Sequence, residues 1–275
     1  MTEKIETLGI IAGDQSLPLV LAQEARAQGV RRLIAIGFEN LSNRDLEPLV
    51  DKMLWMRIGQ LSKLIDAFRE HGVRHCVMVG KVAPKSFLDA RPDLRTIAAV
   101  LKLKEKNAHT LFGAFAEEMK KDGIELIEAT PWLRTIMPQA GFCIGPKLSD
   151  EQRADVEFGF RIAKEISRLE IGQSVVVKNG AVLAVEGFEG TDKCLQRGGE
   201  LAGKDGGAVA VKVAKEKHDM RWDIPCVGDQ TLQVCIDARV SVLAIEAGKT
   251  LLLNQARVEQ LAKKHRVSML TIGNA

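Results

Sequence analysis

The first half of the chain repeats one unit, a short apolar segment followed by an amphipathic helical segment that ends at glycine. The apolar segments are mostly apolar on both faces, which is typical of strands buried inside a parallel sheet. They are 8–12, 33–36, 53–56, 76–79 and 124–127. Helical periodicity covers 18–29, 60–72 and 110–123. This alternation predicts an α/β fold with a Rossmann-like N-terminal domain at 1–132.

The second half has a different pattern. Residues 129–146 contain three prolines and two glycines without a sustained period, so we predict a linker at 133–148. A capping box, Ser149-Asp-Glu-Gln152, then opens a helix with an apolar stripe. Two β-runs flank Asn179-Gly180 as in a hairpin, and 242–253 predicts a second hairpin bending at 247–249. We therefore predict a C-terminal catalytic α/β domain at 149–275, of mixed type with β-hairpins.

Composition limits the partners. The 275 residues carry 39 basic and 36 acidic side chains, interspersed, and the net charge of +3 predicts no nucleic acid partner. Five scattered cysteines without a Cys-x-x-Cys pair predict neither disulfides nor a zinc site, and fit a reducing, cytoplasmic location. The N-terminal residues show no secretory pattern, and no apolar run approaches the ~20 residues of a membrane span. We expect at most peripheral contact with the inner membrane, and a homodimer is left open.

Two segments of the first half fall beyond the carboxyl ends of strands, where open parallel sheets bind ligands. In 9–18 a strand turns into a helix, and backbone N–H groups near Gly13 and Gln15 would suit a phosphate. The alternative is an ordinary strand-to-helix turn, and without Gly-x-Gly-x-x-Gly a dinucleotide site is poorly supported. Lys81, in Val-Gly-Lys-Val, is either a phosphate ligand or simply solvated.

Acidic residues gather where the Asn-Gly hairpin runs into a helix. Glu186, Glu189 and Asp192 lie near a strand end, where metal or phosphate sites are commonly built. The other interpretation is structural, with Thr191 or Asp192 as the N-cap of the helix.

Segment 212–228 is the most informative. Because Pro225 disfavours helix before it, we predict extended chain in which Asp219, Arg221 and Asp223 share one face. Carboxylates bind Mg²⁺ and arginine grips phosphate oxygens, and hydrolysis of a phosphoric anhydride uses both. The alternative is a surface strip of salt bridges. No Gly-x-Ser-x-Gly elbow, Walker loop or His-Glu-x-x-His motif offers another chemistry.

Together these segments resemble the LpxI-type UDP-2,3-diacylglucosamine pyrophosphatases of lipid A biosynthesis. The likeness covers nearly the whole chain, and it rests on 8–18, 79–82, 171–192 and 219–228. The resemblance implies a Rossmann-like domain, a C-terminal α/β domain and a cleft between them for UDP-2,3-diacylglucosamine. It also implies Mg²⁺-dependent hydrolysis to UMP and 2,3-diacylglucosamine 1-phosphate (lipid X), with water attacking the β-phosphorus.

The resemblance also suggests roles for single residues. Asp223, Asp219 and Arg221 would be catalytic, and Asp223, Asp219 and Asp192 would hold the metal. The substrate would be bound by Gly13, Gln15, Lys81, Gly190, Thr191, Asp192, Lys212 and Thr231.

Three departures from the family pattern bear on substrate or rate. They are Asp14-Gln15-Ser16 in place of glycines, 106–109 in place of an acidic segment, and His218 in place of glutamine.

Three rival functions stay open on the sequence. A nucleotide-sugar-binding protein without turnover would bind a UDP-sugar but release no UMP. A pyrophosphatase for a different UDP-sugar would share the chemistry but not the substrate. A Rossmann oxidoreductase would retain nicotinamide, and the missing glycine fingerprint speaks against it.

Overall fold

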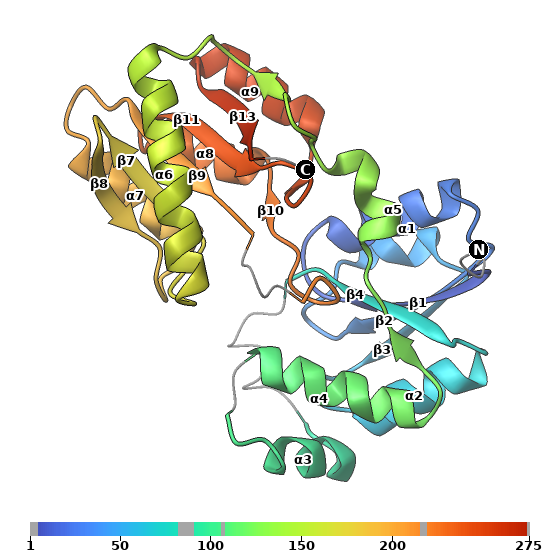
Figure 1. Cartoon of the computed structure of the whole chain (residues 1–275). Helices are drawn as coiled ribbons and strands as arrows, with labels where there is room; N and C mark the ends of the chain where they lie inside the picture. The colour runs from blue at the N-terminus through green and yellow to red at the C-terminus, as the bar shows by residue number, and fades with distance from the viewer. Residues whose placement is uncertain (1–4, 82–90, 106–107, 215–218, 274–275) are drawn as a thin grey trace. The chain divides into compact units, whose positions relative to one another are not determined.

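The chain folds into two units, seen in a computed structural model that describes residues 5–81, 91–105, 108–214 and 219–273 (Figure 1). The first unit consists of Met1–Leu133 together with Asp219–Trp222. The second consists of Arg134–His218 and Asp223–Ala275. A four-residue segment of the C-terminal half thus belongs to the first unit, which the sequence pattern does not predict.

The first unit is built on a five-stranded sheet in the order β3-β2-β1-β4-β5, all parallel. This is the doubly wound order, so the predicted Rossmann-like fold is confirmed. The strands are β1 (Thr7–Ala12), β2 (Arg32–Phe38), β3 (Lys52–Met56), β4 (His75–Val79) and β5 (Glu125–Leu126). The helices are α1 (Leu17–Ala27), η1 (Arg44–Leu49), α2 (Leu61–Glu70), α3 (Leu94–Leu101), α4 (Ala108–Lys121) and α5 (Thr130–Leu133).

Helices cover both faces of this sheet, with α1 on one side and α2 and α4 on the other (Figure 1). On the second side, Ile34 and Ile36 of β2 pack against Leu64 and Phe68 of α2 and Met119 of α4. Alternate strand residues therefore reach opposite helical layers, as the apolar runs predict.

The second unit holds a six-stranded mixed sheet in the order β6-β13-β11-β9-β7-β8. β9, β11 and β13 are parallel, and β6, β7 and β8 pair antiparallel to their neighbours. The strands are β6 (Cys143–Ile144), β7 (Ser174–Lys178), β8 (Ala181–Val185), β9 (Ala208–Lys212), β11 (Val240–Glu246) and β13 (Ser268–Ile272). The predicted mixed α/β class is confirmed.

Four long helices cover this sheet. They are α6 (Asp150–Arg168), α7 (Thr191–Leu201), α8 (Asp229–Asp237) and α9 (Gln255–His265), and a short helix η3 spans Arg134–Ile136. Val175 and Val177 face α6, whereas Val176 faces the core formed with α7, α8 and α9. A separate pair of short parallel strands, β10 (Cys226–Val227) and β12 (Leu251–Leu252), lies outside the main sheet.

Several local predictions are confirmed. Ser149 accepts from the Gln152 amide while the Gln152 side chain accepts from the Ser149 amide, which is the full capping box. The Asn179-Gly180 turn joins β7 and β8, and the Asp155 carboxylate accepts both of its amides at 2.8 Å.

Two segments differ from the sequence pattern. The predicted hairpin at 242–253 is wrong, because β11 pairs with β9 and β13 while β12 pairs with β10, all in parallel. The segment 133–148, which the sequence pattern assigns to a linker, contributes β6, whose partner β13 lies near the end of the described chain. In the described parts of the chain, no helix is both long and apolar enough to cross a membrane.

Candidate functional site

The best-defined polar site lies at one edge of the second unit's sheet. Lys212 and Glu246 are the last residues of the parallel strands β9 and β11. Ser174 begins the antiparallel strand β7 and pairs with Lys212, and the Glu186 amide donates to the Ser174 carbonyl at 2.9 Å. All four residues are therefore at the carboxyl edge of the parallel strands, where open α/β sheets bind ligands.

Four polar side chains at this edge form a connected cluster. Thr191 Oγ1 donates to Glu186 Oε1 at 3.0 Å and accepts from Lys212 Nζ at 3.1 Å. The Ser174 hydroxyl lies 3.4 Å from the Thr191 hydroxyl. Lys212 is 7% exposed and Glu186 is 6% exposed, so both charges are held largely out of water. Buried charges are retained where they are paired or where a site uses them.

Helix starts add further positive character to the same edge. Gly190 is the N-cap of α7, and its φ of 85° is a conformation that favours glycine. No side chain caps this helix. α8 begins after Gly228, again without a side-chain cap. Each helix leads back to the start of the next parallel strand, so its N-terminus lies at the carboxyl edge of the sheet. Uncapped N–H groups at such helix starts attract anions.

The substrate-binding residues predicted in α7 and α8 fall in these first turns. Thr191 is the first residue of α7 and joins the cluster above. The N-cap of α7 is Gly190, so the alternative interpretation, with Thr191 or Asp192 as the N-cap, is wrong. Asp192 follows it and is exposed. Thr231 is the third residue of α8 and is half-buried.

Asp223 precedes the short strand β10 and is exposed. Three residues further on lies Cys226, a half-buried residue whose thiol pKa is raised to about 11 by the loss of water around the sulfur. The positive charge of Lys212 lowers that pKa and the negative charge of Asp223 raises it, so both charges lie within electrostatic range of one sulfur atom. The Cys226 thiol thus responds to the charges of both Asp223, the predicted catalytic carboxylate, and Lys212. The sequence position of Cys226 does not predict this.

Glu246 is a functional-site candidate that the sequence interpretation missed. Its carboxylate is 3% exposed and accepts from Lys249 Nζ at 2.8 Å, Lys164 Nζ at 3.3 Å and the Ala214 amide at 2.9 Å. Burial alone would raise the pKa of Glu246, but the bonds from Lys249 and Ala214 and the two ammonium charges hold it below its ordinary value. The signal in the sequence is a glutamate that closes an otherwise apolar strand, Val-Ser-Val-Leu-Ala-Ile-Glu.

Asp219 and Arg221 lie in the first unit and form a turn, so the predicted extended strand with a shared face is wrong. Arg221 donates to both Asp219 oxygens, at 2.9 and 2.6 Å, and these hydrogen bonds, with the Asp219 charge, raise the pKa of Arg221. The guanidinium also lies 4.5 Å from the ring centre of Trp222, which in turn lies 6.4 Å from that of Phe112 in α4. The local ion pair and the docking of Trp222 outweigh the extended tendency before Pro225.

The loops after β1 and β4 are joined by backbone bonds. The Gly13 amide donates to Val79, and Asp14 and Lys81 exchange amide bonds at 2.8 and 3.1 Å. A Cβ at Gly13 would come within 2.7 Å of the Gly80 backbone, so close packing explains this glycine without a ligand. Gln15 and Lys81 have exposed side chains. The contribution of these three residues to substrate binding stays a prediction.

An apolar pocket opens at the carboxyl edge of the first unit's sheet. Its cavity volume is about 70 Å³, and it is partly open to solvent. Its walls include Ile11, Phe38, Leu64, Met78, Thr96, Phe112, Phe115 and Met119. Such a wall suits a hydrocarbon chain better than a nucleotide phosphate.

The predicted metal ligands do not form one preassembled cluster. Within the described residues, no group of three or more His, Cys, Asp or Glu side chains could hold a metal ion. Asp219 accepts from Arg221, and Asp192 and Asp223 are exposed. Mg²⁺ is often held by one or two carboxylates plus substrate phosphates, an arrangement that needs no preassembled cluster, so the ligand role of these residues stays a prediction.

The structure therefore brings Gly190, Thr191 and Lys212 together, and the charges of Lys212 and Asp223 both act on the Cys226 thiol. Gly13, Gln15, Lys81, Asp219 and Arg221 belong to the first unit. Of the departures noted above, His218 and residues 106–107 lie outside the described residues, as does the side chain of His109.

Known proteins give a consistent comparison. The sequence model for the LpxI N-terminal domain matches residues 7–136, and that for the LpxI C-terminal domain matches residues 139–270. The UDP-2,3-diacylglucosamine pyrophosphatase LpxI of Caulobacter vibrioides is 29% identical over 262 residues, covering 91% of this chain and 92% of that protein.

Solved structures add no functional information. A biotin carboxylase from Campylobacter jejuni aligns with a TM-score of 0.29 at 13% identity, over 72% of this chain and 42% of that one. The biotin carboxylase domain of the Hydrogenobacter thermophilus 2-oxoglutarate carboxylase gives 0.28 at 14% identity, over 74% and 42%. The chain thus spans less than half of these carboxylases, and likenesses at this level carry no argument. The two domain matches together cover nearly the whole chain, and the chain belongs to the LpxI family.

Proposed function

We propose that the chain hydrolyses the diphosphate of UDP-2,3-diacylglucosamine to UMP and 2,3-diacylglucosamine 1-phosphate. Membership of the LpxI family supports this, as does the activity named for the relative from Caulobacter vibrioides. The observation that carries the proposal is Lys212, a buried cation at the carboxyl edge, bonded to Thr191 at the uncapped start of α7. A buried ammonium beside open helix amides is suited to a ligand with adjacent phosphates.

The residues of this edge would divide the work. Lys212 and the first amides of α7 would neutralise the phosphate oxygens. Glu186 would fix the Thr191 hydroxyl, because Thr191 Oγ1 already donates to its carboxylate. The exposed Asp223 carboxylate would orient the attacking water or hold a metal ion. We further propose attack at the β-phosphorus, with UMP as the leaving group.

Mg²⁺ is part of the proposal. When bound, it would neutralise charge on the diphosphate, which carries more negative charge than a single lysine can offset. Asp223 is the side chain best suited to hold it, since it is exposed and its charge, like that of Lys212, acts on the Cys226 thiol.

The apolar pocket of the first unit supports the proposal that the substrate carries fatty acyl chains. A fatty acyl chain gains free energy by leaving water, and the pocket offers Phe112, Phe115 and Met119 as apolar walls. A nucleotide-sugar without long acyl chains would leave this pocket unused.

The direct test is incubation of the pure chain with UDP-2,3-diacylglucosamine and Mg²⁺, followed by mass spectrometry of the products. We expect UMP and the acylated sugar 1-phosphate. UDP-N-acetylglucosamine, which lacks long acyl chains, is the matched control and should be hydrolysed far more slowly. Binding of the diacyl substrate without UMP release would establish the binding-protein alternative. Comparable rates on both compounds would indicate a pyrophosphatase for another UDP-sugar.

A further inference from the structure

Helix α3 presents large apolar side chains to solvent. Leu94 is 85% exposed, Ile97 40% and Leu101 72%, and their spacing places all three on one face. In the described part of the first unit, the large apolar residues with such exposure all lie on this helix. We call these three side chains the α3 face. A short helix that leaves three large apolar side chains in water needs an explanation beyond its own folding.

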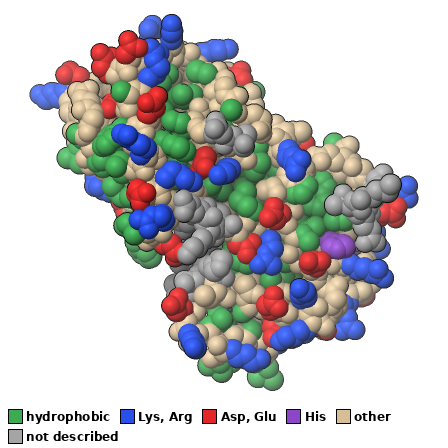
Figure 2. Space-filling view, viewed as in Figure 1, with side chains coloured by type: hydrophobic (Ala, Val, Ile, Leu, Met, Phe, Trp, Pro, Cys, Tyr) green, Lys and Arg blue, Asp and Glu red, His purple; other side chains and the backbone are tan. Residues whose placement is uncertain are grey.

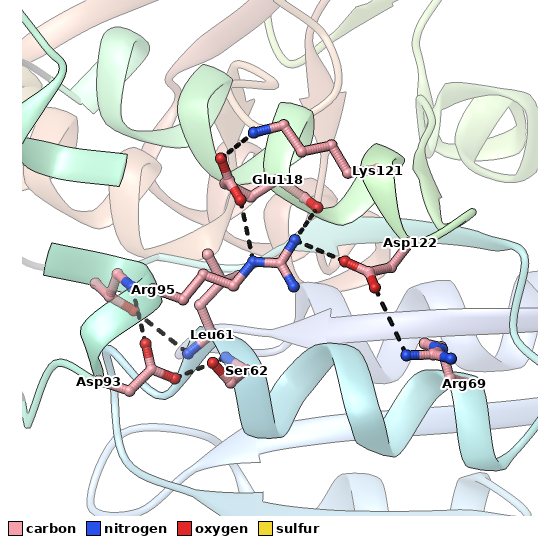
Figure 3. A network of polar contacts seen from close by, with 9 residues as sticks. Leu61, Ser62, Arg69, Asp93, Arg95, Glu118, Lys121 and Asp122 are labelled. Atoms are coloured by element: carbon pink, nitrogen blue, oxygen red, sulfur yellow. Dashed lines mark hydrogen bonds and ion pairs between the residues drawn. The ribbon is translucent and has the colours of Figure 1, made fainter. Parts of the chain in front are cut away.

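The opposite side of α3 is firmly attached (Figure 3). Asp93 caps the helix by accepting from the Thr96 amide at 2.8 Å, and it also accepts from the Ser62 amide of α2 at 2.7 Å. Arg95 forms ion pairs with Glu118, in the last turn of α4, at 3.0 Å and with Asp122, just after that helix, at 2.6 Å. The α3 face is thus held outward by contacts made on the other side of the helix.

The helix also separates the α3 face from the apolar pocket. Thr96 is 5% exposed, lines the pocket and donates to the Gly59 carbonyl at 2.6 Å. One side of α3 therefore borders an apolar cavity while the other offers apolar groups to the exterior.

Basic side chains flank the α3 face. Among the described residues next to α3 in the sequence, Arg91, Lys102 and Lys104 are exposed basic residues and Glu105 is an exposed acidic one. Arg95 does not add to this charge, because it is paired with Glu118 and Asp122. At the lower end of Figure 2, where Figure 1 draws α3, apolar and basic side chains lie next to one another.

We propose that the α3 face is a docking surface for a lipid bilayer with anionic headgroups. Apolar side chains flanked by basic ones are the pattern of segments that lie in a membrane interface, where hydrocarbon burial and attraction to anionic lipid add together. The inference rests on the proposed function, because a diacylated substrate resides in a bilayer and must be collected there. The position of α3 beside the apolar pocket is the second, independent argument.

Vesicle flotation of the full chain tests the proposal. Wild type should float with vesicles of phosphatidylethanolamine and phosphatidylglycerol, and far less with phosphatidylcholine. The variant L94S/I97S/L101S should lose binding by about 10- to 100-fold, since partial burial of three apolar side chains is removed. K102E/K104E should lose about fivefold or more per lysine on anionic vesicles. The matched control L169S/L201S removes leucines that are 57% and 60% exposed in the second unit, and should bind as wild type.

Two further readouts separate the possible outcomes. Hydrolysis of detergent-dispersed substrate should be unchanged in L94S/I97S/L101S, while hydrolysis of vesicle-embedded substrate falls. Loss of all hydrolysis in wild type would overturn the proposed function but leave the vesicle result standing. Equal flotation of wild type and L94S/I97S/L101S would overturn the docking surface. The docking surface would also be overturned if L94S/I97S/L101S sedimented as a monomer, wild type as a dimer, and the two floated equally. The α3 face would then bind a second copy of the chain.

Discussion

At the scale of single residues, two charges that act on the Cys226 thiol are central to the proposed chemistry. Asp223 is exposed, so its replacement should remove little packing, and we expect Asp223→Ala to change the unfolding free energy by less than about 0.5 kcal/mol. Turnover should fall by about 10²- to 10⁴-fold, the usual effect of losing a group that positions or activates water. Substrate binding, measured by calorimetry, should persist.

Asp205→Ala is the control for this prediction, because Asp205 is exposed in the same unit just before β9 begins, at the opposite edge of the sheet. Near-normal turnover in Asp223→Ala, or a collapse of its melting temperature, would remove Asp223 from the chemistry.

Lys212 is the other charge. Lys212→Met keeps the buried stem and removes the ammonium, so we expect kcat/KM to fall by about 10- to 100-fold through the loss of a charge-assisted hydrogen bond to phosphate. The melting temperature should change little, since Thr191 keeps its bond to Glu186.

Lys178→Met is the comparison for Lys212→Met. Lys178 ends β7 at the opposite edge of the same sheet and donates to the Ala202 carbonyl. Equal losses of kcat/KM in the two variants would show that the effect is structural and not tied to the phosphates.

At the scale of elements, the end of β11 makes stability depend on pH. The pKa of Glu246 is held below its ordinary value in the folded chain, so its ionised form stabilises the fold above the unfolded pKa of about 4.5. That contribution is lost as pH falls through the folded pKa. Glu246→Gln should therefore lower the unfolding free energy at pH 7 by about 1–3 kcal/mol.

Urea unfolding between pH 7 and pH 3 checks this prediction. The difference between wild type and Glu246→Gln should shrink as pH falls below about 4.5. Glu165→Gln, whose side chain is 64% exposed, should give a small difference at every pH. A constant difference for Glu246→Gln would mean that its ionisation does not stabilise the fold.

Local sequence signals predicted the elements whose causes are local. The apolar runs, the Ser149 capping box and the Asn179-Gly180 turn are each decided by neighbouring residues, and all three are confirmed. The hairpin at 242–253 failed because β11 pairs with β9 and β13, and such distant partners leave no local mark. The sequence pattern did not predict helix α3, because it has only eight residues and carries apolar side chains on two sides.

The candidate site was predicted in part for the same reason. Lys212 ends β9, and Gly190 and Thr191 follow the end of β8, so the rule for parallel sheets brings them to one edge. The ion pair of Asp219 with Arg221 agrees with the salt-bridge alternative. The turn in which they lie could not be foreseen, because Trp222 docks against Phe112, far earlier in the chain. Glu246 was overlooked since its lysine partners come from α6 and from the loop after β11.

At the scale of the whole molecule, the proposal requires a divalent cation. Exhaustive chelation with EDTA should stop hydrolysis and Mg²⁺ should restore it, because the diphosphate needs more positive charge than Lys212 provides. Zn²⁺ should restore less, since the described residues offer no cluster of His and Cys ligands. Full activity after chelation would reject the metal-assisted mechanism.

The central claim is hydrolysis of the diphosphate by attack of water on the β-phosphorus. Running the reaction of the intact chain with UDP-2,3-diacylglucosamine in ¹⁸O-water tests it directly, because the attacking oxygen stays on the phosphorus that it strikes. Mass spectrometry should find the heavy oxygen in the acylated sugar 1-phosphate and none in UMP. Heavy oxygen in UMP would show attack at the α-phosphorus, and the absence of both products would contradict the proposed activity itself.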